Sequence, residues 1–311
     1  MVVSPLSMFC YSKAVQCSVA ATVALLLRTN HSRHWPAIHR CVHNDRNDCA
    51  IMELPKVVEI LERIAPPSTA ASWDNVGLLV EPSGSPVVKN VFLTNDLTLP
   101  VMDEAEQRNA QLIVSYHPPI FAPLRALRQS QWKERLVIRC LEKGIAVYSP
   151  HTAWDAVEGG ANDWLASCLG SSSTTEPLTT DGAGRRLRLD PPVALEELAT
   201  RLRTHVGASK VRLALAVRHT ASSAISRVSL CAGSGISVLR DEFDDAELVV
   251  TGEMSHHDIL DATQRGASVL LCEHAVSERG SLDRFAKLLS REAPDLTVII
   301  SQADTGPLQL V

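Results

Sequence analysis

Short apolar runs recur along the chain after residue 50, and most are followed by a polar or glycine-containing segment and then by apolar residues at helical spacing. The first helical pattern covers residues 52–64, where apolar residues lie three and four positions apart, and Pro66-Pro67 ends it. The apolar runs predict strands at 91–94, 112–115, 145–149, 228–232, 248–251, 269–272 and 298–301. Strands that alternate with helices predict an α/β fold with a parallel or mixed sheet.

One central segment breaks this alternation. Residues 170–186, GSSSTTEPLTTDGAGRR, are rich in Ser, Thr and Gly and show no apolar periodicity. We therefore expect a linker at 170–190 that separates a first α/β lobe at 51–169 from a second α/β lobe at 191–311.

The first 50 residues differ in composition from the rest of the chain. They contain five Lys or Arg residues against two acidic ones, together with four of the eight cysteines. The uncharged run at 14–27 is too short to cross a bilayer. An acid-poor start that contains arginine is typical of a mitochondrial transit peptide, with a secretory signal or a disordered extension as the alternatives. We therefore expect a mitochondrial location, with a cytoplasmic and nuclear one as the alternative.

Charge and cysteine usage narrow the class of protein. The formal net charge is −5, and no cluster of Lys and Arg appears, so we expect no direct contact with nucleic acid and no membrane. None of the four cysteines after residue 50 has a CxxC partner. They are therefore expected to be free thiols in a reducing compartment.

Side chains that can bind metals or carry protons follow several of the predicted strands. In open α/β sheets, ligands bind beyond the carboxyl ends of the strands. Three imidazoles and three carboxylates fall at or near such positions: His117, His151, Asp155, Glu253, His274 and Glu278. Imidazole and carboxylate ligands suit Zn, Mn or Fe, and a bridging carboxylate can hold two ions for hydrolysis. A polar network without any ion is the alternative.

Three other features have simpler interpretations. Asp74 is expected to form a turn before a strand. Asp96 either supports a ligand from behind or caps the next helix. The loop with Gly233 and Gly235 could hold a phosphate on backbone N–H groups. It lacks the full glycine pattern of a nucleotide site, so a tight turn is the simpler interpretation.

Eight ordered segments resemble the Ngg-one-interacting-factor-three-like family, and its animal members in particular. They include SWDNVGLLVEP at 72–82, SYHPPIF at 115–121, TGEMSHHDILDA at 251–262 and CEHAVSERG at 272–280. The resemblance implies two α/β lobes with mixed sheets, one or two divalent metal ions (Zn, Mn or Fe) between them, and a homo-oligomeric ring assembled from dimers. The ligands that it implies are His117, Asp155, His274 and Glu278, with His151 and Glu253 as proton carriers nearby.

The resemblance leaves the function open between two classes. One is a metal-dependent hydrolase of unknown substrate, such as a nucleotide or phosphoester, in a family often labelled as related to a GTP cyclohydrolase. The other is a non-enzymatic oligomeric interaction protein, or a co-regulator with a transcription-regulator partner. Many bacterial members have a histidine where this chain has Tyr116, so we expect a second metal ion to bind weakly or not at all.

Overall fold

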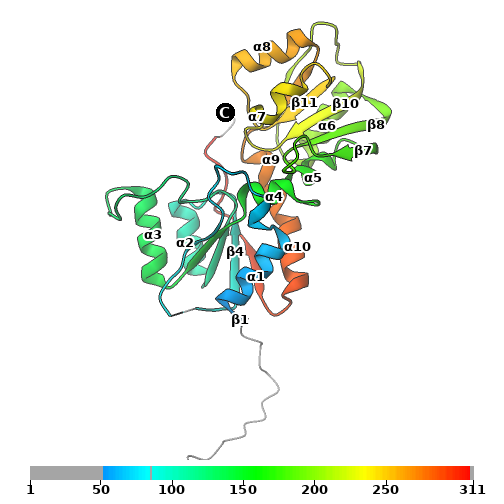
Figure 1. Cartoon of the computed structure of the whole chain (residues 1–311). Coiled ribbons are helices and arrows are strands. Elements are labelled where there is room, and N and C mark those ends of the chain that lie inside the picture. Colours follow the sequence, from blue (N-terminus) through cyan, green and yellow to red (C-terminus); the bar gives the residue numbers. More distant parts are fainter. Residues whose placement is uncertain (1–51, 85, 309–311) are drawn as a thin grey trace, which may run out of the picture. The chain divides into compact units, whose positions relative to one another are not determined.

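The structure is a computed structural model, and it describes residues 52–84 and 86–308 (Figure 1). The predicted leader at 1–50 lies outside the described residues. The described part contains two large sheets and one two-stranded ribbon, in which β1 (Met52–Glu53) pairs with β3 (Val87–Val88).

The first sheet has five strands. Its order is β13 (Thr297–Ile300), β4 (Asn90–Thr94), β5 (Leu112–Ser115), β6 (Ala146–Ser149) and β2 (Gly77–Val80). All neighbouring pairs are parallel except β2 and β6. Because β4, β5 and β6 are buried on both faces, they need the continuous apolar runs that the sequence shows.

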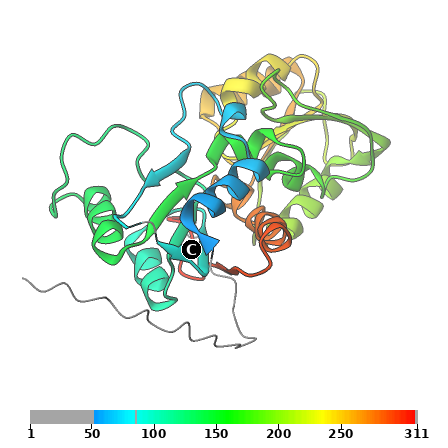
Figure 2. The ribbon, with the colours of Figure 1, turned by 60° about the horizontal axis from the view of Figure 1, so that its bottom comes forward.

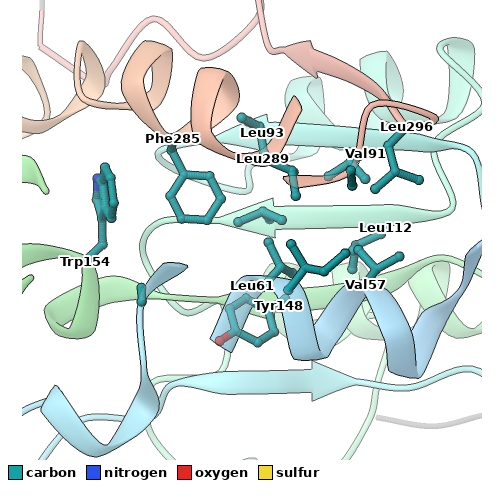
Figure 3. Packing of buried hydrophobic residues seen from close by; sticks show 14 of the residues in the cluster. Val57, Leu61, Val91, Leu93, Leu112, Tyr148, Trp154, Phe285, Leu289 and Leu296 are labelled. Atoms are coloured by element: carbon teal, nitrogen blue, oxygen red, sulfur yellow. The ribbon is translucent and has the colours of Figure 1, made fainter. Parts of the chain in front are cut away.

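Two pairs of helices cover this sheet. On one face lie α1 (Leu54–Ile64) and α10 (Leu282–Glu292), which are side by side in Figures 1 and 2 and contact each other. On the other face lie α2 (Leu99–Gln107) and α3 (Trp132–Lys143). Figure 3 shows the core under α1 and α10, where α1 side chains meet those of the strands and of α10. Packing on both faces fixes the strand ends that carry the candidate ligands.

The second sheet has six strands. Its order is β7 (Ser172–Glu176), β8 (Arg185–Ala194), β10 (Ala224–Cys231), β11 (Leu248–Thr251), β12 (Ser268–Leu271) and β9 (Arg212–Ala214). β10, β11 and β12 are parallel, and the other neighbouring pairs are antiparallel.

Helices cover both faces of the second sheet as well. One face packs against α5 (Ala161–Ala166) and α6 (Leu195–His205). The other packs against α7 (Ile236–Leu239), the short 3-10 helix η2 (Arg240–Glu242) and α8 (His256–Arg265). Ser255 caps α8, and Gly266 ends it in a left-handed conformation.

The predicted α/β class with mixed sheets is confirmed, but the predicted linker and lobe boundaries are wrong. Most of residues 170–190 form the hairpin β7–β8 at the edge of the second sheet. In β8, exposed arginines alternate with buried residues, so the segment has a strand period that its many polar residues hide. The predicted second lobe also ends too late. Its last two elements belong to the first sheet, because α10 packs on that sheet and β13 pairs with β4.

Two further expectations concern cysteines and membranes. Cys140, Cys168, Cys231 and Cys272 are free thiols, as predicted. Within residues 52–84 and 86–308, none of the helices has the length and apolar character that a bilayer crossing requires.

Candidate metal centre

Two histidines and one glutamate converge at the strand ends of the two sheets. His117 follows β5, His274 follows β12, and Glu278 lies in the short helix α9 (Val276–Arg279). Their donor atoms all lie within 4.8 Å of one another. The carboxylate oxygens of Glu278 lie 3.4 Å from His117 Nε2 and 3.2 Å from His274 Nε2, and the two Nε2 atoms are 3.4 Å apart. One carboxylate therefore lies between two imidazoles.

A carboxylate holds each of these imidazoles from behind. His117 Nδ1 lies 2.9 Å from Asp96 Oδ1, and His274 Nδ1 lies 3.0 Å from Glu253 Oε1. Because each Nδ1 donates its proton to a carboxylate, each ring is fixed with Nε2 turned toward Glu278. The same carboxylate–histidine pairing orients histidine ligands in metal sites.

The carboxylate of Glu278 is enclosed by protein atoms. Its residue is 2% exposed, and Asn95 Nδ2 donates a hydrogen bond of 3.0 Å to Oε2. Gly233 lies against the same carboxylate, and a Cβ atom at this position would be 2.4 Å from Glu278 Oε1. Asn95 Oδ1 is buried and has no hydrogen-bond partner in the described part of the chain. Gly233 therefore leaves room for the Glu278 carboxylate, and Asn95 Oδ1 is a buried acceptor that is still open to a ligand.

The charges in this cluster favour a cation between the rings. Burial opposes ionisation of Glu278, but hydrogen bonds from His117 and His274 lower its pKa to about 2. Burial also opposes protonation of His117, and hydrogen bonds to Asp96 and Glu278 overcome it and raise its pKa to about 10. The hydrogen bond to Glu278 raises the pKa of His274 to about 9, against burial. A divalent ion would take the place of these protons.

Asp155 lies near this group but has a different partner. It is in α4 (His151–Ala156), and Tyr116 Oη donates a hydrogen bond of 2.6 Å to its Oδ1. Burial raises the pKa of Asp155 to about 6, although the Tyr116 bond lowers it. Burial and the charge of Asp155 hold the pKa of Tyr116 well above its usual value, so the phenol keeps its proton. One oxygen of Asp155 is therefore engaged by Tyr116.

His151 forms a second carboxylate–histidine pair. Its Nδ1 lies 2.7 Å from Asp74 Oδ1, and the Asp74 side chain has no exposed area. Burial opposes ionisation of Asp74, but hydrogen bonds from His151 and Thr152 hold its pKa below the usual value. Asp74 is thus an ionised acceptor that fixes the His151 imidazole. The sequence predicts only a turn at Asp74 and does not predict this contact.

A cavity of about 330 Å³ connects these groups. The residues that define its chemistry are Tyr116, His151, Asp155, His274 and Glu278. The lining contains no Lys or Arg within the described ranges, whereas Asp155, Asp181 and Glu278 all belong to it. Glu253 does not line this cavity, because it lies on the other side of His274.

Comparison with known proteins identifies the family. Residues 52–307 match the family described as Duf34/NIF3 (NGG1p interacting factor 3). The chain belongs to the NIF3 family. It is 45% identical over 269 residues to NIF3-like protein 1 of Drosophila melanogaster, an alignment that covers 83% of this chain and 89% of that protein. It is 34% identical over 279 residues to NGG1-interacting factor 3 of Saccharomyces cerevisiae, with 82% and 96% covered.

A solved structure of a protein related to NIF3 supports the fold. The Bacillus cereus protein related to NIF3 superposes with a TM-score of 0.75 at 19% identity, and the match covers 84% of this chain and 99% of that chain. Identity this low supports only the fold, so the chemistry of the site depends on the geometry described above.

The predicted NIF3-family ligands fit one metal ion more completely than two. His117, His274 and Glu278 offer two imidazole nitrogens and a carboxylate, a set that suits Zn, Mn or Fe. Asp155 lines the same cavity, but it lies outside this group of three and is engaged by Tyr116. Glu253 supports His274, and His151 is held by Asp74. The strand-end pattern revealed His117 and His274, but nothing in the sequence links Asp74 to a histidine 77 positions away.

Proposed function

We propose that this protein is a metal-dependent hydrolase that binds its substrate in the cavity beside His274 and Glu278. The observation that carries the proposal is the convergence of His117, His274 and Glu278, each imidazole held by its own carboxylate. Family membership supports it, since the same chain segments that resemble the family carry these residues. We propose Zn, Mn or Fe as the ion, one per chain in the group of three, with Asp155 as a ligand of any second ion.

Each polar group has a defined part in this proposal. His117, His274 and Glu278 would hold a divalent ion, which when bound would supply Lewis-acid polarisation of a substrate oxygen and a lower pKa of bound water. Glu253 and Asp96 position the two imidazoles and do not themselves move protons. His151 donates its Nδ1 proton to Asp74, which leaves Nε2 to accept a proton from the attacking water and return it to the leaving group.

Metal content and turnover of the full chain test the proposal together. We expect inductively coupled plasma mass spectrometry to find at least one ion per chain in the wild type and in the control His257→Ala, and none in His274→Ala. Hydrolysis should be screened on phosphoesters, nucleotides, amides and purines. With any substrate found, His274→Ala should abolish turnover, and His151→Asn should lower it about 10²–10⁴-fold with the metal retained. Turnover that survives in His274→Ala contradicts the proposal.

A second candidate function is a homo-oligomeric interaction protein. The name of the yeast relative, NGG1-interacting factor 3, points to a protein partner, a transcription regulator in this proposal. The edge strand β9 and the residues after it also expose apolar side chains, namely Leu213, Leu215 and Val217. Light scattering on wild type and Leu215→Lys tests a ring assembled from dimers. A monomeric wild type contradicts this candidate, and loss of assembly in Leu215→Lys without any turnover in the wild type favours it over the hydrolase.

A further inference from the structure

Three aromatic rings form a corner at the cavity that contains His274 and Glu278. Trp73, Phe121 and His151 all line this cavity. Their ring centroids are 6.1 Å apart for Trp73 and Phe121, 6.2 Å for Trp73 and His151, and 6.3 Å for Phe121 and His151. The corresponding planes meet at 67°, 77° and 88°. The three ring centroids therefore form a nearly equilateral triangle, and the ring planes are steeply inclined to one another. We call these three residues the aromatic corner.

The aromatic corner contributes little to the core of the protein. Trp73 is 64% exposed and Phe121 is 50% exposed, and neither belongs to the hydrophobic clusters that pack the described residues. A single exposed aromatic residue is common on protein surfaces. Two that contact each other and line a cavity with several convergent polar groups indicate a ligand site.

The charges around the cavity restrict the kind of ligand. The described lining residues include Asp155, Asp181 and Glu278 but no Lys or Arg. The carboxylates of Asp74, Asp96 and Glu253 lie directly behind the imidazoles. These six carboxylates carry more negative charge than one or two divalent ions neutralise. A ligand with several phosphates meets repulsion here, whereas the faces of aromatic rings attract positive charge.

We propose that Trp73 and Phe121 bind the planar ring of a heteroaromatic substrate that carries a positive charge or none. The substrate ring would contact the aromatic corner. A bond at the edge of the substrate ring would then lie between His151 and the side of the cavity that His274 and Glu278 line. The volume of about 330 Å³ is at the lower end of the range for small-molecule pockets, as a single or fused pair of rings requires. The proposal rests on the proposed function for the reaction, but ring binding itself needs no turnover.

A series of probes with one ring system and three charges tests the binding proposal. We would titrate the full chain, loaded with metal, with N-methylquinolinium, quinoline and quinoline-6-carboxylate, and measure affinity by calorimetry and by saturation-transfer NMR. We expect N-methylquinolinium to bind most tightly and quinoline-6-carboxylate most weakly. Trp73→Leu should weaken N-methylquinolinium binding about tenfold, which matches the range of cation–π interactions.

Trp132→Leu is the matched control. Trp132 is also an exposed tryptophan, at 46%, but it belongs to α3 and does not line this cavity. We expect Trp132→Leu to bind all three probes as the wild type does, and all three proteins to contain the same amount of metal. The proposal is overturned if quinoline-6-carboxylate binds as tightly as N-methylquinolinium, or if Trp73→Leu and Trp132→Leu have the same affinity as the wild type.

The two proposals fail in different measurements. The hydrolase proposal is tested by the metal content and turnover of His274→Ala. The ring-binding proposal is tested by the order of affinity of the three probes and by Trp73→Leu. Wild-type protein that binds no metal but still prefers N-methylquinolinium through Trp73 contradicts the hydrolase and supports the ring site. Protein that loses metal and turnover in His274→Ala but shows no charge order supports the hydrolase and overturns the ring site.

Discussion

Gly233 lies against the Glu278 carboxylate in a backbone conformation that other residues rarely adopt, with φ +65°. We expect Gly233→Ala to displace this carboxylate, because the new Cβ atom would be 2.4 Å from Oε1 and 3.2 Å from His274 Nε2. The variant should lose most of its metal, as measured by mass spectrometry. It should also be less stable to urea by about 1–2 kcal/mol, since a left-handed conformation disfavours any Cβ atom.

Gly207→Ala separates these two effects. Gly207 has nearly the same conformation, with φ +66°, but no atom lies within 4 Å of the Cβ position. It should therefore show the stability loss with full metal content. If Gly207→Ala and Gly233→Ala bind metal equally well, the contact with Glu278 does not control the site.

Glu253 provides a second prediction at the residue scale, because it holds His274 through Nδ1 at 3.0 Å. Glu253→Gln removes the negative charge and weakens the hold on the ring, so we expect a 10–100-fold loss of metal affinity, measured by competition with a chelating dye. Glu273→Gln is the control, since Glu273 is next to His274 in sequence but pairs with Arg212. Equal affinities of the two variants would argue that Glu253 does not position the ligand.

The sequence reveals candidate ligands better than the groups that support them. His117 and His274 follow apolar runs, and Glu278 lies one helical turn after His274, so strand ends and spacing indicate all three. Asp74 and Tyr116 could not be assigned in the same way. Their roles depend on contacts with His151 and Asp155, which only the packed chain brings near.

At the scale of elements, apolar runs predict buried strands well because these strands are covered on both faces. The runs at 112–115 and 248–251 coincide with β5 and β11, and the others lie within a few residues of their strands. The hairpin β7–β8 was missed because an edge strand exposes one face, so its polar residues resemble a linker. The return of β13 to the first sheet was missed because no local pattern specifies a partner strand.

The side chain of Arg185 connects the hairpin β7–β8 to α5. It is buried, forms two hydrogen bonds with Asp163 at 2.6 and 3.1 Å, and donates to the carbonyl oxygens of Ala156, Val157, Gly182 and Gly184. Arg185→Ala removes the charged partner of the partly buried Asp163 and the hydrogen bonds to these carbonyls, so we expect a loss of about 3–5 kcal/mol in the free energy of unfolding by urea. Arg291→Ala removes an exposed pair with Glu292 and should cost less than about 1 kcal/mol. A similar cost for both variants would contradict this role.

At the scale of the whole molecule, Asp304 links the segment after β13 to the candidate metal centre. Its Oδ2 accepts hydrogen bonds from Asn95 N at 2.6 Å and Thr94 Oγ1 at 3.0 Å, and its Oδ1 pairs with Arg279 at 2.8 Å. Because Asn95 donates to Glu278, we expect Asp304→Ala to weaken metal binding about tenfold, and to cost about 3 kcal/mol of stability by leaving Arg279 without its partner. Asp283→Ala, on the exposed face of α10, is the control and should change neither quantity.

Metal removal tests whether the ion joins the two sheets. His117 follows a strand of the five-stranded sheet, whereas His274 follows a strand of the six-stranded one, so an ion held by both binds only the folded chain. At a free metal concentration 100 times Kd, binding adds about 2.7 kcal/mol of stability. In a chain of this size, that corresponds to a Tm higher by about 4–5 °C.

A chelator should therefore lower the Tm of the wild type and of His257→Ala by this amount in scanning calorimetry. It should leave the Tm of His274→Ala unchanged, because that variant has already lost the shared ligand. A chelator effect of equal size in all three proteins would mean that the ion binds elsewhere. No effect in the wild type, after loading is verified, would mean that the ion does not stabilise the connection between the two sheets.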